Sequence, residues 1–272
     1  MSGASRALLA KVSDIARRAG AQILAEYASG SSEVTLKEDA SPLTRADLRA
    51  HRVIADALGA LTPDIPLLSE ESAQVPFAVR ARWARHWLVD PLDGTKEFLA
   101  RNGQFTVNIA LIEADTPVLG VVHVPASATT YQGLPASGAW CEVAGEAPRA
   151  IRVAERSARP VRVVGSRSHR GDSLDGFLAR LGAHELVPVG SSLKFCLVAQ
   201  GAADVYPRLG PTNGWDTAAA HAVALAAGAT VCALDGEPLR YNTGAQLLNP
   251  HFVVYGARDH DWLALLREAQ AP

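Results

Sequence analysis

The chain has few residues that could form disulfide bonds, and no long apolar run that could anchor it in a membrane. It holds one methionine and three cysteines, which are Cys141, Cys196 and Cys232. The cysteines are odd in number and far apart, without CxxC spacing, so we expect reduced core residues rather than a disulfide framework. No apolar run reaches the ~18 residues of a membrane span. Charges at Arg6, Lys11 and Asp14 interrupt any signal-peptide run. These features predict a cytoplasmic protein.

The chain also lacks an excess of charge of either sign. Its 26 Lys and Arg residues nearly balance 28 Asp and Glu residues, for a net charge of −2. This balance predicts no nucleic-acid polymer as a partner, because such proteins carry a basic surface. An anionic small molecule would have to be bound by cationic or hydrogen-bond-donating groups gathered at one site. Composition leaves open whether the chain is a monomer or a homodimer, and whether it touches the cytoplasmic face of the inner membrane peripherally.

A short apolar run at residues 87–89 leads into two closely spaced carboxylates. Asp90 and Asp93 are three residues apart, with Pro91 and Leu92 between them and Gly94 directly after. We expect Pro91 to end the strand ladder and Gly94 to permit a turn, so that both carboxylates aim at one point. The carbonyl of Leu92 adds a third hard oxygen, and such oxygens suit Mg²⁺.

The residues after this turn predict a phosphate site. Thr95 to Ala100 read as a short helix, whose first amides, those of Gly94 and Thr95, would favour a phosphate. The simpler alternative is that Asp-Pro-x-Asp-Gly forms an ordinary surface turn.

Further carboxylates end or begin other predicted elements. Glu70 and Glu71 follow a predicted buried strand, and adjacent strand side chains diverge, so only one of them can face Asp90 and Asp93. Asp47 opens a helix, and Asp216 lies in the first turn of an alanine-rich helix over residues 215–227. For these last two, the alternative is an acid that complements the helix dipole.

Two motifs together resemble the signatures of the lithium-sensitive, inositol monophosphatase-like phosphatases. The first is Trp-x-x-Asp-Pro-x-Asp-Gly-Thr-x-x-Phe at residues 87–98. The second is Trp-Asp-x-x-Ala-Ala from residue 215, followed by Ala-Gly at residues 227–228. The resemblance implies an α/β, or α+β layered sandwich, fold with alternating helix and sheet layers.

The helix and strand pattern fits such a fold and divides the chain in two. Residues 1–154 predict an antiparallel sheet flanked by two opening helices, and carry most of the candidate metal ligands. Residues 155–272 alternate strand and helix, and carry Asp216 and the candidate nucleotide-recognition loops.

The resemblance also implies roles for the carboxylates. Two Mg²⁺ ions would be held by Glu70, Asp90, the Leu92 carbonyl, Asp93 and Asp216. Asp47 would hold or orient a water, with a third and weaker metal left open, and Thr95 beside it would help deprotonate that water, so that Asp47, Glu70 and Thr95 are the candidate catalytic residues. The substrate phosphate would contact Glu70, Leu92, Asp93, Gly94, Thr95 and Asp216.

Stretches in the second half resemble the bacterial 3′(2′),5′-bisphosphate nucleotidases of this superfamily. They are residues 165–169, 190–196, 203–208 and 210–213. A bisphosphate needs a donor-rich pocket away from the metals. The resemblance supplies Ser168, His169, Ser191, Lys194 and Arg208. Taken singly, Ser191 could cap a helix, Lys194 could lay its stem on apolar surface, and Arg208 could be a surface charge.

The implied activity is Mg²⁺-dependent hydrolysis of the 3′-phosphate of 3′-phosphoadenosine 5′-phosphate, giving AMP. The sulfated analogue, 3′-phosphoadenylyl sulfate, is a second candidate substrate. The nearest alternative is an inositol monophosphatase. A haloacid-dehalogenase-type phosphatase fits less well, because its two aspartates are two residues apart and near the chain start. A catalytically silent nucleotide sensor would be expected to have lost a metal ligand, and none is missing.

Overall fold

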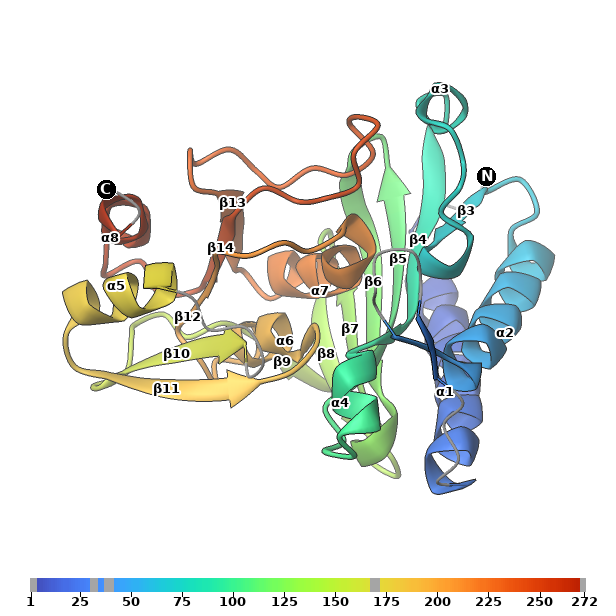
Figure 1. The fold of residues 1–272 in the computed structure, drawn as a ribbon, viewed down its shortest axis with the longest axis horizontal. Helices are drawn as coiled ribbons and strands as arrows, with labels where there is room; N and C mark the ends of the chain where they lie inside the picture. The colour runs from blue at the N-terminus through green and yellow to red at the C-terminus, as the bar shows by residue number, and fades with distance from the viewer. Residues whose placement is uncertain (1–3, 30–33, 37–41, 167–171, 270–272) are drawn as a thin grey trace.

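Helix and sheet layers alternate across the molecule. The computed structural model describes residues 4–29, 34–36, 42–166 and 172–269. Figure 1 shows the order of layers: helices α1 and α2, a seven-stranded sheet, helices α6 and α7, a five-stranded sheet, and helices α5 and α8. The prediction of a layered α/β fold is confirmed. No helix among these described residues is both long enough and apolar enough to span a membrane.

The seven-stranded sheet holds the strands of the first half in the order β3-β4-β5-β6-β7-β8-β9. Its neighbouring strands are antiparallel except for the parallel pair β3 and β4. The strands are β3 (Leu67–Ser69), β4 (Arg85–Asp93), β5 (Thr106–Glu113), β6 (Thr116–Val124), β7 (Thr129–Leu134), β8 (Gly138–Val143) and β9 (Arg149–Ile151). A separate two-stranded ribbon pairs β1 (Val34–Leu36) with β2 (Pro42–Thr44).

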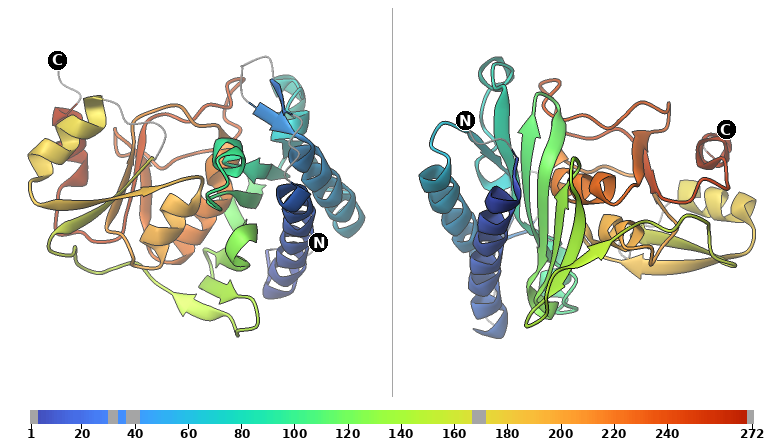
Figure 2. Two further views of the ribbon diagram at one scale, coloured as in Figure 1. Left: turned by 60° about the horizontal axis from the view of Figure 1, so that its bottom comes forward. Right: turned by 180° about the vertical axis from the view of Figure 1, so that it is seen from behind.

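Helices α1 (Arg6–Ser29) and α2 (Arg45–Leu61) cover one face of this sheet, as both views in Figure 2 show. Their apolar stripes bury against alternate residues of β5. The apolar face that the alternation in this strand predicts, comprising Phe105, Val107, Ile109 and Leu111, is fully buried there. The polar residues between them therefore point to the opposite face, toward the second half of the chain.

The second sheet has the strand order β11-β10-β12-β14-β13, with parallel and antiparallel pairs. Its strands are β10 (Val161–Ser166), β11 (His184–Val189), β12 (Val205–Arg208), β13 (Thr230–Ala233) and β14 (Phe252–Tyr255). Helices α5 (Asp172–Leu181) and α8 (Trp262–Glu268) form the outermost layer. Whether residues 1–154 and 155–272 are separate domains stays a prediction.

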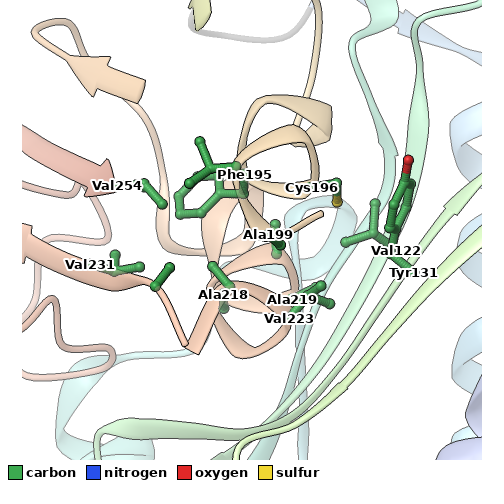
Figure 3. Packing of buried hydrophobic residues seen from close by; sticks show 14 of the residues in the cluster. Val122, Tyr131, Phe195, Cys196, Ala199, Ala218, Ala219, Val223, Val231 and Val254 are labelled. Carbon is green, nitrogen blue, oxygen red and sulfur yellow. The ribbon is translucent and has the colours of Figure 1, made fainter. Parts of the chain in front are cut away.

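Helix α7 (Gly214–Ala226) lies between the two sheets beside α6 (Leu193–Ala199). Figure 3 shows its small side chains, such as Ala218 and Ala219, packed among residues of α6 and of both sheets. The approach is close, because a Cβ on Gly120 of β6 would lie 2.1 Å from the Ala219 carbonyl oxygen. A Cβ on Gly133 of β7 would lie 2.5 Å from the Val223 Cα. All three cysteines are buried and free, as predicted.

Two local predictions were wrong. Pro91 does not end the ladder, because β4 continues to Asp93 after a register shift between Asp90 and Asp93. The shift accommodates the missing amide donor of the proline. Glu70 and Glu71 do not end a strand either, since β3 stops at Ser69 and the two glutamates lie in a 3₁₀ turn, η1 (Glu70–Ser72). The strand alternation argument therefore does not decide which glutamate faces the site.

Candidate active site

Three carboxylates from distant parts of the chain meet at one point. Glu70 of η1, Asp90 of β4 and Asp216 of α7 each offer an oxygen, and these atoms all lie within 4.8 Å of one another. Asp90 is 2% exposed. The glutamate that faces the cluster is therefore Glu70, as the resemblance implies, and the cluster joins the first half of the chain to the second.

The backbone after Asp90 fixes this carboxylate, continues as strand to Asp93 and turns at Gly94. The backbone N–H of Leu92 donates to Asp90 Oδ1 over 3.0 Å, which fixes that carboxylate. Gly94 has φ +89°, in the left-handed region that glycine favours, and α4 (Thr95–Leu99) begins directly after it. A surface turn is ruled out as the sole description, because Asp90 and Leu92 are buried.

Asp93 lies beside the cluster and is held by donors from both halves of the chain. Its Oδ2 accepts the backbone N–H of Ser192 at 2.6 Å and the Asn108 side-chain amide at 3.3 Å. The Thr106 hydroxyl also donates to it, over 3.4 Å. Asp93 is thus oriented by neutral donors from β5 and from the loop that precedes α6.

Asp47 and Asp216 each cap a helix at the same time as they face the site. Asp47 Oδ2 accepts the backbone N–H of Thr44 at 2.8 Å, and Asp216 Oδ2 accepts that of Asn213 at 2.9 Å. In both helices these bonds form half of a capping box. Both residues are therefore acids at a helix N-terminus, as the simpler alternative predicted. This capping role does not exclude a second role in the site.

Thr95 connects this set to Asp47. Its hydroxyl lies 3.4 Å from Asp47 Oδ1 and 3.3 Å from the Leu92 carbonyl oxygen, and it can donate to either. The Asp47 oxygen that faces Thr95 is the one not used in the capping bond to the Thr44 amide. Sequence resemblance predicted that these two residues are neighbours, and the structure brings them together.

The site carries more negative charge than its surroundings can offset. Burial raises the pKa of Asp90 and of Asp216 well above the usual range, and neighbouring carboxylates raise both further. Burial likewise raises the pKa of Asp47 to about 6, although its bonds to Thr44 oppose the shift. Burial also raises the pKa of Asp93, opposed by the charge of Lys194 and the Ser192 amide.

Divalent cations fit this donor set. The groups are carboxylate oxygens with the Leu92 carbonyl nearby, a hard-oxygen set of the kind that Mg²⁺ and Ca²⁺ prefer. Buried carboxylates that repel one another are stabilised by multivalent cations and destabilised without them. Glu70, Asp90 and Asp216 would hold such a cation, with Asp93 beside them.

The predicted phosphate-recognition residues are only partly at the surface of the site. Ser191 has φ +51° and lies next to Gly94, on which a Cβ would approach the Ser191 Cβ to 3.3 Å. Lys194 is 6% exposed, and its ammonium donates to the Ser191 carbonyl beneath the loop of residues 190–192. The alternative in which Lys194 only lays its stem on apolar surface is therefore incomplete. Burial lowers the pKa of Lys194 to about 8.

Arg208 lies at the end of β12. Its charge is close enough to Asp93 and Asp216 to oppose the rise in the pKa of both aspartates. Its Nη2 donates to the Pro211 carbonyl over 2.6 Å. Its Nε is buried and has no hydrogen-bond partner among the described residues. An unpartnered buried donor here suits an anionic ligand. Ser168 and His169, the other two predicted recognition residues, lie outside the described residues.

Sequence reasoning missed the residues that hold Asp93 and the loop in front of α6. They are Gln104, Thr106, Asn108 and Ser192. The first three alternate with the apolar residues at the start of β5, so they share the face of the sheet that looks toward the second half. A polar side of an otherwise buried strand was the signal that could have found them.

Comparison with known proteins decides the family. The model of the inositol monophosphatase family matches residues 6–270. The chain belongs to the inositol monophosphatase family. The resemblance of its two motifs is thereby confirmed, and the chain is a phosphatase of that family, whose members use divalent metal ions.

Individual relatives match over almost the whole chain. A 3′(2′),5′-bisphosphate nucleotidase CysQ from Salmonella typhimurium is 52% identical over 248 residues, which cover 91% of this chain and 99% of the relative. A CysQ from Haemophilus influenzae is 37% identical, over 96% of this chain and 97% of the relative. The crystal structure of CysQ from Bacteroides thetaiotaomicron superposes with a TM-score of 0.80 at 40% identity, covering 93% and 98% of the two chains.

Proposed function

We propose that the chain is a 3′(2′),5′-bisphosphate nucleotidase that removes the 3′-phosphate of 3′-phosphoadenosine 5′-phosphate to give AMP. The sulfated analogue, 3′-phosphoadenylyl sulfate, would give adenylyl sulfate in the same way. Water adds to the phosphorus, the bond to the ribose 3′ oxygen breaks, and that oxygen takes a proton. The observation that carries the proposal is the cluster of Glu70, Asp90 and Asp216, of which Asp90 is buried, in a chain 52% identical to a protein named for this activity.

We infer that the cations are two Mg²⁺ ions, with a third as an open variant. The ligands would be Glu70, Asp90, the Leu92 carbonyl, Asp93 and Asp216. When bound, the ions would neutralise the carboxylates, polarise the phosphoryl group and lower the pKa of a water molecule. The remaining steps fall to side chains and amides of the chain itself.

Asp47 and Thr95 would take a proton from the attacking water. The Thr95 hydroxyl can accept from water while it donates to Asp47 Oδ1, 3.4 Å away. A pKa of about 6 leaves Asp47 mostly ionised near neutral pH but basic enough to receive a proton. The amides of Gly94 and Thr95 at the start of α4 would donate to the phosphate oxygens.

The second phosphate would bind on the side of Ser191, Lys194 and Arg208. Arg208 offers an unpartnered Nε, and Lys194 contributes charge from beneath the loop of residues 190–192. Ser168 and His169 would complete the pocket. A substrate held at both ends is oriented for attack at one phosphorus, and orientation is worth several kcal/mol in favourable cases.

The test is phosphate release from a panel of substrates with Mg²⁺. The panel contains 3′-phosphoadenosine 5′-phosphate, AMP and inositol 1-phosphate, and the expected order of kcat/KM places the bisphosphate first by a wide margin. Arg208→Ala should lower kcat/KM for the bisphosphate roughly tenfold more than it lowers kcat/KM for inositol 1-phosphate, because only the bisphosphate loses a charge-assisted contact as well. Arg240→Ala is the matched control, since Arg240 pairs with the exposed Asp115 instead.

An inositol monophosphatase is the second candidate function. The Thermotoga maritima IMPase superposes with a TM-score of 0.75 at 26% identity, covering 94% of this chain. Wild-type preference for inositol 1-phosphate would select this alternative and reject the nucleotidase. Oligomeric state, membrane contact and cellular location stay predictions.

A further inference from the structure

Asn108 is a buried polar residue in the middle of the seven-stranded sheet. It lies on β5 directly opposite Asp90 in the antiparallel register with β4, and its side chain is fully buried. Its neighbours Val107 and Ile109 face α1 and α2, so Asn108 faces the other way, toward the loop before α6. A buried amide in this position needs partners for both its donor and its acceptor atoms.

Both ends of this amide are used, and each connects to a different part of the site. Nδ2 donates to Asp93 Oδ2 over 3.3 Å. Oδ1 accepts the hydroxyl of Ser192 at 2.8 Å, and the same hydroxyl lies 3.0 Å from the Thr106 hydroxyl. The backbone N–H of Ser192 returns to Asp93 Oδ2 at 2.6 Å, so Asp93, Asn108 and Ser192 form a closed ring of hydrogen bonds.

We propose that Asn108 is a positioning residue that sets the orientation of Asp93 for metal binding and ties it to the loop of residues 190–192. The inference rests on the proposed function, in which Asp93 is a metal ligand. Asn108 acts through Asp93 and Ser192, and has no contact with substrate in this role.

The physical reason lies in the freedom of a carboxylate to rotate. An aspartate with one oxygen fixed by three donors, as Asp93 is, presents its other oxygen in a defined direction. Outer partners of this kind tune metal affinity roughly 10- to 100-fold. The ring also makes the direction of Asp93 depend on the seating of Ser192, which comes from the second half of the chain. Loss of Asn108 would therefore loosen the metal ligand and the recognition loop together.

The experiment measures metal binding without substrate. Mn²⁺ serves as a spectroscopic probe, and its dissociation constants are obtained by electron paramagnetic resonance titration of the metal-free protein. Asn108→Leu removes both side-chain bonds and keeps the number and branching of the side-chain heavy atoms. Ser192→Ala removes only the hydroxyl and keeps the backbone donor to Asp93. Thr130→Val is the matched control, because it removes a buried side-chain bond of the same sheet, to His123, on the face covered by α1.

We expect Asn108→Leu to weaken Mn²⁺ binding about tenfold, Ser192→Ala to weaken it by a smaller factor, and Thr130→Val to leave it unchanged. With saturating Mg²⁺ most of the kcat of Asn108→Leu should return, whereas a lost catalytic group would not be rescued in this way. If folded Asn108→Leu binds Mn²⁺ as tightly as the wild type, this inference is overturned and the proposed function is not. Should Asn108→Leu not fold, the same result in Ser192→Ala overturns it. If the wild type binds no Mn²⁺, the metal assignment of the proposed function fails, and the inference with it.

Discussion

Replacing Asp90 by asparagine should separate two effects of its charge, which are repulsion of the neighbouring carboxylates and attraction of the metal ion. Its oxygen lies within 4.8 Å of those of Glu70 and Asp216. Two full charges at 4.8 Å repel by about 3.5 kcal/mol at an effective dielectric constant of ~20. Burial raises the pKa of Asp90 and Asp216 well above the usual range, so their ionised forms are unfavourable in the metal-free protein. Metal-free Asp90→Asn should therefore be as stable as the wild type, or more stable by a few kcal/mol.

Added metal should shift the balance of stability toward the wild type. A ligand at about 100 times its dissociation constant stabilises a protein by ~2.7 kcal/mol, and a hundredfold loss of affinity reduces this to ~0.4 kcal/mol. For a chain of this size, the melting temperature of the wild type should rise with Mg²⁺ by roughly 5–10 °C, and that of Asp90→Asn by about 1 °C.

The assay is thermal unfolding of both proteins with EDTA and with Mg²⁺, paired with phosphate release. An unchanged Mg²⁺ shift and near-normal turnover in Asp90→Asn would refute the assignment of Asp90 to the metal site. Asp115→Asn is a suitable control, because Asp115 is an exposed carboxylate whose partner Arg240 lies outside the site.

Three further predictions concern pH, backbone geometry and inhibition. Burial, with a smaller repulsion from Arg17, lowers the pKa of His123 to about 4. As the pH falls, this histidine is therefore protonated in the unfolded state before it is protonated in the folded state. Between pH 7 and 4 the free energy of unfolding of the wild type should fall by ~3 kcal/mol relative to that of His123→Gln. If urea titrations show that the difference between the two unfolding free energies does not change with pH, the prediction is wrong. Gly94→Ala, at φ +89° with a Cβ 3.1 Å from the Gln104 carbonyl, should lose roughly 1–3 kcal/mol of stability and most activity; wild-type urea unfolding would show that the turn adapts. Li⁺ should inhibit phosphate release where an equal concentration of Na⁺ does not, and equal effects of the two ions would count against the inhibition that the family resemblance implies.

Local patterns in the sequence predicted most of the helices and strands, because period-two and helical spacing report directly which side of an element is buried. The face of β5 with Val107 and Ile109 is an example. The 3₁₀ turn at Glu70 was not predictable in this way, since no periodic signal marks three residues whose conformation depends on their neighbours in the fold.

For the site, the family resemblance predicted the carboxylates, whereas the hydrogen bonds around Asp93 depend on how the two halves of the chain pack together. Asn108 and Ser192 are 84 residues apart in the chain, and only the stacking of the two halves brings them together. Lys194 shows the same limit, because a lysine in a predicted recognition loop gives no sign that its ammonium is turned inward to backbone carbonyls.

The tight seating of α7 against β6 and β7 has a consequence for the genetics of the protein. At Gly120 and Gly133 the space for a side chain is filled by backbone atoms of residues 219 and 223, which no substitution in α7 can remove. Loss-of-function alleles at these two codons should thus revert only at the same codon, without intragenic suppressors in the helix. Gly165 is different, because a Cβ there would first meet Cδ1 of Leu186 at 3.0 Å, and a smaller residue at position 186 would relieve it. The spectrum of revertants should in this way distinguish contacts made by backbone from contacts made by side chains.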